Sequence, residues 1–110
     1  MIEIKSEAEF NLLLGSNEKI LVDFYANWCG PCKQLMPMVE ALDVPGVTVV
    51  KVNADEQPEI VNRYGVRGLP TLKAIRNGEV SGTKTGMMTA GQLIAFVNTN
   101  FNDDQLSVDL

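Results

Sequence analysis

The chain has 110 residues, of which 45% are hydrophobic and 21% charged, and its formal net charge is −5 at pH 7. This size and composition predict one globular domain with a single core, and the acidic balance argues against nucleic-acid binding through a basic surface. The complete absence of histidine excludes Ser-His-Asp and Cys-His catalysis and Cys/His zinc sites.

The N-terminal half predicts two helices around one buried strand. A Ser-x-x-Glu capping box at residues 6–9 opens a helix that Gly15 is expected to end. Residues 20–26 form a nearly continuous apolar run, typical of a central strand buried on both faces. A second helix begins near Gly30. Its apolar residues keep helical spacing beyond Pro37, which predicts a kink at that proline rather than an end.

The C-terminal half predicts strands at residues 47–52, 71–76 and 79–85, and helices at residues 58–64 and 89–101. Asn77-Gly78 is a strong two-residue hairpin signal between the last two strands. Thr89 and Gln92 form a second capping box, and the inner side of the helix that it opens is expected to carry Leu93, Ile94, Phe96 and Val97.

The predicted order of elements is βαβαβα followed by ββα, which defines the fold class as α/β. Parallel strands need crossover helices and a hairpin joins antiparallel strands, so a mixed β-sheet flanked by helices on both faces follows. Residues 1–101 form the predicted domain. Residues 102–110 carry three of the fourteen acidic residues and are expected to be a loosely ordered acidic tail.

Both cysteines of the chain, Cys29 and Cys32, lie in one Trp-Cys-Gly-Pro-Cys segment at the start of a predicted helix. At this spacing the two side chains face the same way, and their Cα atoms fall within the roughly 4.4–6.8 Å that a disulfide requires. The first sulfur lies beside free N–H groups at the positive end of the helix dipole, which favours the thiolate. The pair is therefore interpreted as a redox-active dithiol. The alternatives are two inert thiols or a static disulfide, although so short a bridge removes little chain entropy.

Asp23 lies in the middle of the apolar strand at residues 20–26. A carboxylate in that position either costs several kcal/mol or stays protonated with a raised pKa, unless it is paired. Because unexplained buried acids often mark functional sites, Asp23 is a candidate site residue. The alternative is a structural hydrogen bond to the backbone.

From about residue 20 to residue 101 the chain resembles the thioredoxin family. The resemblance rests on motifs that occur in the expected order: Val22-Asp23-Phe24, Trp28-Cys29-Gly30-Pro31-Cys32-Lys33, Pro37, Lys51 and Asp55 at a strand end, Tyr64-Gly65-Val66-Arg67-Gly68-Leu69-Pro70-Thr71, Asn77-Gly78 and Gly86. It implies the thioredoxin fold, the reduction of protein disulfides, and a cis peptide bond between Leu69 and Pro70 that faces the cysteines.

The resemblance also implies roles for single residues. Cys29, expected to be exposed, would be the nucleophile, and Cys32 would resolve the mixed disulfide that forms. Asp23 would be a buried proton acceptor for Cys32, modulated by Lys51 on the neighbouring strand. For Lys51 the alternative is a lysine that simply reaches solvent.

The resemblance likewise implies roles for the residues around the cysteines. Gly30 and Pro31 would tune the redox potential, since the family places Gly-Pro in reductants and a histidine here in oxidases and isomerases. An apolar, substrate-binding rim would consist of Trp28, Leu69, Pro70, Gly86 and Met87. Two departures stand out: Tyr25 replaces a tryptophan common in the family, and Met87-Met88 follows Gly86 where a smaller residue is usual.

The resemblance implies a monomer without bound cofactor or metal, recharged by NADPH through a flavoprotein thioredoxin reductase, with disulfide-containing proteins as substrates. The start of the chain has no secretory signal and no apolar run is long enough for a membrane span, so a cytoplasmic location is expected. The alternatives are an oxidase or isomerase in an oxidising compartment, a non-catalytic docking subunit, and a metal bridged between two chains by the cysteines.

Overall fold

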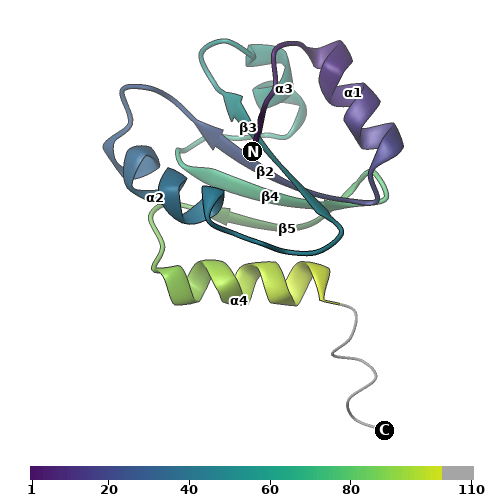
Figure 1. The fold of residues 1–110 in the computed structure, drawn as a ribbon. Coiled ribbons are helices and arrows are strands. Elements are labelled where there is room, and N and C mark those ends of the chain that lie inside the picture. The colour runs from purple at the N-terminus through teal and green to yellow at the C-terminus, as the bar shows by residue number, and fades with distance from the viewer. Residues whose placement is uncertain (103–110) are drawn as a thin grey trace, which may run out of the picture.

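The computed structural model describes residues 1–102; the predicted acidic tail lies outside the described residues from residue 103 onward. The elements follow the predicted βαβαβα–ββα order (Figure 1), and their bounds are β1 (Ile2–Glu3), α1 (Glu7–Ser16), β2 (Lys19–Tyr25), α2 (Gly30–Glu40), β3 (Val47–Asn53), α3 (Pro58–Arg63), β4 (Thr71–Arg76), β5 (Glu79–Thr85) and α4 (Ala90–Phe101).

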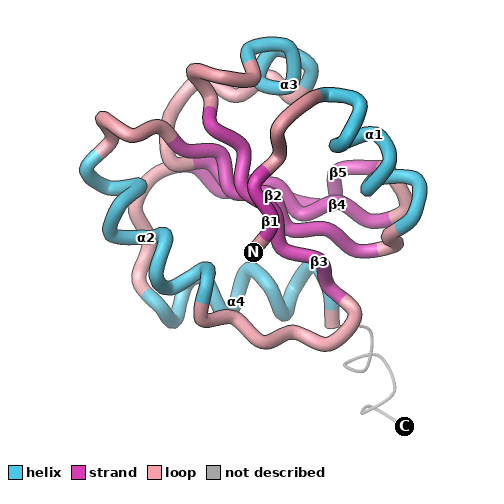
Figure 2. The backbone as a smooth tube through the Cα atoms, turned by 45° about the horizontal axis from the view of Figure 1, so that its top comes forward, coloured by secondary structure: helices cyan, strands magenta, loops and turns pink. Residues whose placement is uncertain are grey.

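Within residues 1–102 the sheet has five strands in the order β1-β3-β2-β4-β5, with β2 at its centre (Figure 2). β2 runs parallel to β3, to which α2 connects it, and antiparallel to β4. β4 and β5 form the predicted hairpin. Its turn places Asn77 at φ 52° and Gly78 at φ 83°, the left-handed conformation that Asn-Gly adopts readily in a two-residue turn.

Helices cover both faces of the sheet, α1 and α3 on one and α2 and α4 on the other (Figure 1). Because the side chains of β2 alternate between two faces that are both covered by helices, its sequence is apolar at nearly every position. Ile20, Val22 and Phe24 enter the cluster beneath α1 and α3, whereas Leu21 enters the cluster beneath α2 and α4. Asp23 follows Leu21 by two residues and therefore points toward the α2 side.

Helix α1 extends past its predicted stop. Gly15 lies inside the helix, which ends at Ser16, so the prediction that Gly15 ends it is wrong. The backbone N–H and the side-chain amide of Asn17 both donate to the Leu13 carbonyl at 3.0 Å, and these bonds satisfy the carbonyl that a glycine cap would otherwise serve.

The last helix begins as predicted. Thr89 Oγ1 accepts the Gln92 N–H at 3.1 Å and Gln92 Oε1 accepts the Thr89 N–H at 2.9 Å, which completes the capping box. Ile94, however, is 52% exposed, so its predicted place on the inner side is wrong. Helical periodicity brings Leu93 and Val97 inward and leaves Ile94 on the flank.

Candidate active site

The two cysteines lie where the central strand passes into α2. Cys29 is the N-cap residue of the helix and Cys32 lies in its first turn. They form a disulfide with a Cα–Cα distance of 5.3 Å, as their spacing predicts. Pro31 occupies the first turn without disturbing the helix, because no intrahelical partner is needed for an N–H there.

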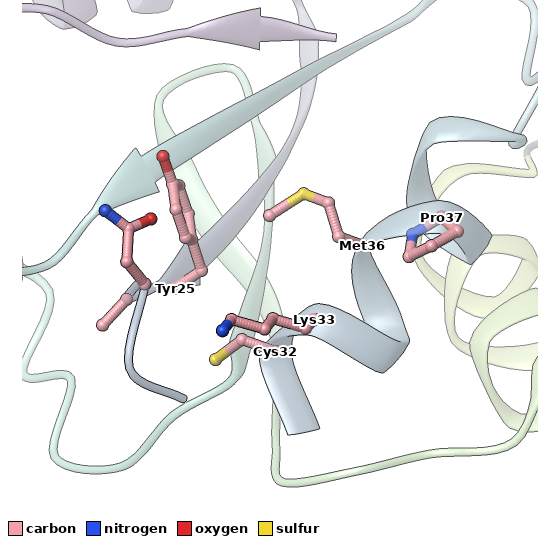
Figure 3. Close-up of a pocket in the computed structure, with 7 residues that line it drawn as sticks. Tyr25, Cys32, Lys33, Met36 and Pro37 are labelled. Atoms are coloured by element: carbon pink, nitrogen blue, oxygen red, sulfur yellow. The ribbon is translucent and has the colours of Figure 1, made fainter. Parts of the chain in front are cut away.

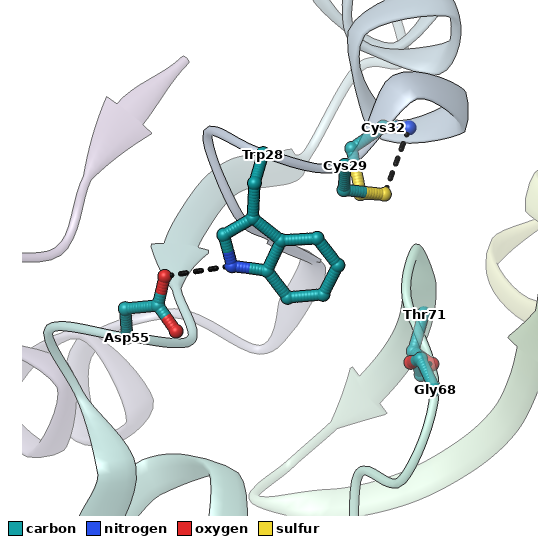
Figure 4. The surroundings of a disulfide bond; sticks show 6 residues. All are labelled: Trp28, Cys29, Cys32, Asp55, Gly68 and Thr71. Carbon is teal, nitrogen blue, oxygen red and sulfur yellow. Dashed lines mark hydrogen bonds between the residues drawn. A yellow bond between two sulfur atoms is a disulfide. The ribbon is translucent and has the colours of Figure 1, made fainter.

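The Cys29 sulfur acts as the cap of α2. It accepts the backbone N–H of Cys32 at 3.2 Å (Figure 4). A sulfur held by an N–H group at the positive end of a helix is stabilised as an anion once the disulfide opens. Of the two cysteines, Cys29 is therefore the one whose thiolate form the helix stabilises more.

Both cysteines are buried in the disulfide form, since Cys29 is 4% exposed and Cys32 2%. The prediction of an exposed Cys29 is therefore wrong for this form of the protein. The physical reason is packing: the disulfide belongs to a small cluster with Tyr25 and Ala26, and Met36 and Leu69 pack against it.

The loop before β4 faces the disulfide (Figure 4). The Leu69–Pro70 peptide bond is cis, as the resemblance implied. The loop is fastened by two hydrogen bonds, one from the Gly86 N–H to the Pro70 carbonyl at 2.8 Å and one from Thr71 Oγ1 to the Gly68 carbonyl at 2.6 Å. Of the predicted rim residues, Pro70 is buried and Leu69 and Gly86 are half-buried.

Trp28 and Met87 are the exposed members of the predicted rim, with exposed fractions of 71% and 47%. The Trp28 indole N–H donates to Asp55 Oδ2 at 2.9 Å (Figure 4), so the exposed ring is held in place by the turn that follows β3. This partnership was not predicted. The only hint of it in the sequence is that Asp55, an acidic residue, follows the segment that forms β3.

Asp23 is 1% exposed, and within residues 1–102 neither of its carboxylate oxygens has a hydrogen-bond partner. Burial therefore raises the pKa of Asp23 from 3.8 to about 7, while the positive charge of Lys51 pulls in the opposite direction. The structural alternative, a hydrogen bond to the backbone, finds no support in the described part of the chain.

Lys51 is the direct neighbour of Asp23 on β3, but its ammonium group is engaged elsewhere. Nζ of Lys51 lies 3.8 Å from Oε1 of Glu3 and 5.8 Å from the centre of the Tyr25 ring. The Tyr25 hydroxyl in turn donates to Oε2 of Glu3 at 2.5 Å. Sequence reasoning missed Glu3 entirely, because a two-residue edge strand carries no periodic signal.

A pocket of about 270 Å³ opens on the Cys32 side of the disulfide rather than on the Cys29 side (Figure 3). It is lined by Tyr25, Ala26, Asn27, Cys32, Lys33, Met36 and Pro37. No sequence motif marked this pocket, which forms only where the end of β2 meets the first turns of α2.

None of the helices within residues 1–102 is long and apolar enough to cross a membrane. In the same part of the chain, no group of three or more cysteine, aspartate or glutamate side chains is placed to hold a metal ion.

Comparison with known proteins yields consistent matches. The family model described as Thioredoxin matches residues 1–99, which extends the resemblance to the N-terminus. The thioredoxin of Rickettsia bellii is 43% identical over 91 residues, covering 80% of this chain and 87% of the relative. The thioredoxin of Rickettsia prowazekii is 36% identical over 102 residues, covering 89% and 97% respectively.

Solved structures similar to this chain are thioredoxins as well. Plasmodium falciparum thioredoxin superposes with a TM-score of 0.85 at 31% identity, covering 90% of this chain and 98% of that one. The thioredoxin of Malassezia sympodialis gives a TM-score of 0.82 at 32% identity, with coverages of 91% and 90%. With the cysteine pair and the fold in place, the chain belongs to the thioredoxin family of dithiol–disulfide oxidoreductases.

Proposed function

We propose that the chain works as a reductant of disulfides in other proteins, with Cys29 as the attacking and Cys32 as the resolving cysteine. The observation that carries this assignment is the asymmetry of the pair: Cys29 Sγ caps α2 by accepting the Cys32 N–H, which favours a thiolate at Cys29. Gly-Pro between the cysteines, in a chain without histidine, supports reduction over oxidation or isomerisation.

The reaction has two exchange steps. The Cys29 thiolate attacks one sulfur of a substrate disulfide, forms a mixed disulfide and releases the other sulfur as a thiolate. Cys32 then loses its proton and attacks Cys29 Sγ, which forms the Cys29–Cys32 disulfide and releases the second substrate thiolate. The substrate gains two electrons and the cysteine pair loses two.

Asp23 is proposed to accept the proton of Cys32 in the second step. It lies on the face of β2 that α2 covers, on the same side as Tyr25, whose side chain packs with Cys32. A pKa of about 7 leaves Asp23 partly ionised near neutral pH, so that it can take up a proton and release it again. Lys51 is proposed to set this pKa through its charge.

The substrate is proposed to bind in an extended conformation beside the loop at Pro70, by adding a strand. Trp28 and Met87 offer exposed apolar surface for it, completed by Leu69, Pro70 and Gly86. A Cβ atom at Gly30 would meet no atom within 4 Å, so the fold itself does not require a glycine there. Gly30 is therefore proposed to keep space for the substrate, and Pro31 to tune the potential of the pair.

The disulfide is proposed to be reduced again by another protein. The chain binds no cofactor of its own, and NADPH reduces its disulfide through a flavoprotein thioredoxin reductase. It acts as a monomer in the cytoplasm. Family membership supports the reductase partner and the protein substrates, and the net charge of −5 is consistent with a protein that does not bind nucleic acids.

The test is the reduction of insulin disulfides by dithiothreitol with the native chain, Cys29→Ser and the doubly substituted Cys29→Ser/Cys32→Ser. The native chain is expected to accelerate the reaction, and both variants are expected to lose the acceleration. A native chain that leaves the rate unchanged contradicts the proposal, and so does an accelerating double variant.

A further inference from the structure

Four residues form a row across the sheet at the level of Asp23. Glu3 of β1 pairs with Lys51 of β3, Lys51 pairs with Asp23 of β2, and Asp23 pairs with Leu72 of β4. The row thus places one cation between two carboxylates, one of them partly exposed and one buried. The Lys51 ammonium forms its ion pair with Glu3, since Nζ of Lys51 lies 3.8 Å from Oε1 of Glu3. The Asp23 carboxylate, in contrast, has no hydrogen-bond partner within residues 1–102.

The outer carboxylate is itself held in place. Glu3 Oε2 accepts the Tyr25 hydroxyl at 2.5 Å, which leaves Oε1 facing Lys51. The Lys51 ammonium also lies over the Tyr25 ring, 5.8 Å from its centre. The side chains of Glu3 and Lys51 are only 24% and 25% exposed, so solvent screens their attraction less than in a fully exposed pair.

We propose that Glu3 is a positioning residue, which draws the Lys51 ammonium toward β1 and so keeps Asp23 able to exchange a proton with Cys32 near neutral pH. The inference rests on the proposed role of Asp23 as proton acceptor and assigns to Glu3 and Tyr25 a part in that role. Tyr25 contributes the hydroxyl that orients the Glu3 carboxylate.

Lys51 is the charged group near this row that acts on Asp23. β4 offers Asp23 only the apolar Leu72, and α2 contributes Cys32, which is bonded to Cys29. Lys33 of α2 lies beside Tyr25 at the pocket, and Glu56 acts on Tyr25 by its charge. Of these groups, Lys51 is the one whose charge acts on Asp23, where it opposes the larger effect of burial, so a change in the position of Lys51 changes how readily Asp23 ionises.

The test is a titration of the Asp23 carboxyl in the oxidised protein, followed by carbon-13 NMR, in the native chain and in Glu3→Gln. Without the Glu3 charge, Lys51 turns to Asp23 as its remaining carboxylate. The midpoint is expected to fall by about one pH unit, the lower end of the effect of an opposite charge at 4–6 Å. Tyr25→Phe is expected to lower the midpoint by a smaller amount.

Two further variants make the test specific. Glu7→Gln removes a comparable carboxylate, 3.7 Å from Arg63 on the α1 and α3 side of the sheet, and is expected to leave the midpoint unchanged. In a Lys51→Met background, Glu3→Gln is expected to lose its effect, because the cation through which Glu3 acts is gone.

An Asp23 midpoint that is the same in the native chain and Glu3→Gln overturns the inference. A shift that persists in full without Lys51 also overturns it, since Glu3 would then act on Asp23 directly. This titration does not depend on activity. Failure of the proposed role of Asp23 as proton acceptor would show separately, as an Asp23→Asn variant that resolves mixed disulfides at the native rate.

Discussion

Asp23 and Lys51 lie directly opposite each other in the two central parallel strands, yet they do not satisfy each other. The Lys51 ammonium is paired with Glu3, and neither oxygen of the Asp23 carboxylate has a hydrogen-bond partner in the described part of the chain. An ionised Asp23 is therefore poorly compensated, which is unfavourable for stability and useful for proton transfer.

The first prediction concerns the stability cost of Asp23. Its pKa is raised from 3.8 to about 7 in the folded protein, so the folded state binds more protons than the unfolded state between these values. Well below pH 3.8 Asp23 is neutral in both states, so its ionisation costs no stability there. The cost grows as the pH rises toward 7 and is complete above it, where the pKa difference corresponds to about 4 kcal/mol.

Asp23→Asn is therefore expected to raise the free energy of unfolding of the oxidised protein above that of the native chain by more at pH 8 than at pH 4. Urea unfolding at both pH values measures this difference. A gain that is the same at pH 4 and pH 8 would show that Asp23 titrates alike in the folded and unfolded chain.

The second prediction concerns Lys51. Removing its charge in Lys51→Met leaves burial unopposed, so the pKa of Asp23 rises further. The rate at which Cys32 resolves a mixed disulfide is expected to reach its plateau at higher pH and to fall several-fold at pH 7, because less Asp23 is ionised. Stopped-flow measurement of the resolving step over pH 5–9 follows the shift. A profile that moves to lower pH contradicts the proposed role.

The third prediction separates two neighbouring methionines. Met87 is 47% exposed and belongs to the proposed rim, whereas Met88 is 1% exposed and packs in the core beneath α2 and α4. Met87→Ala is expected to raise the KM for protein substrates a few-fold and to change stability by less than about 0.5 kcal/mol. Met88→Ala is expected to cost about 2–5 kcal/mol of stability. Equal effects on stability would contradict this division.

The fourth prediction uses two glycines. Gly15 lies within α1 and an added Cβ would meet nothing within 4 Å, so Gly15→Ala is expected to stabilise the protein by about 0.5–1 kcal/mol. At Gly82 of β5 a Cβ would lie 2.7 Å from Nδ2 and 2.8 Å from Cγ of Asn100, so Gly82→Ala is expected to destabilise it. Thermal unfolding distinguishes the two. A destabilising Gly15→Ala would contradict the helical, unobstructed position of Gly15.

The parts of the molecule that the sequence predicted are those that depend on local signals. The apolar run of β2, the Asn77-Gly78 turn and the capping box at Thr89 each act within a few residues, and all three appear in the structure. The cysteine pair was predictable for the same reason, since a helix start fixes the geometry of residues at i and i+3.

What the sequence did not predict depends on contacts between distant segments. Cys29 is buried in a cluster against which the distant Leu69 packs, and the hydrogen bond between Glu3 and Tyr25 joins strands that are not adjacent in the sheet. Neither the register of a two-residue edge strand nor the packing of a loop leaves a periodic pattern. The isolated carboxylate of Asp23 was predictable as buried, but the residue that holds its counter-charge away was not.

The most direct test of the proposed mechanism is to trap the mixed disulfide. Cys32→Ser, incubated in its reduced form with a disulfide-containing protein, is expected to accumulate a covalent complex through Cys29, detected by intact-mass and peptide mass spectrometry. Cys29→Ser is expected to form little or none. Accumulation through Cys32 in Cys29→Ser at a rate equal to or above that of Cys29 in Cys32→Ser would contradict the assignment of Cys29 as the attacking cysteine.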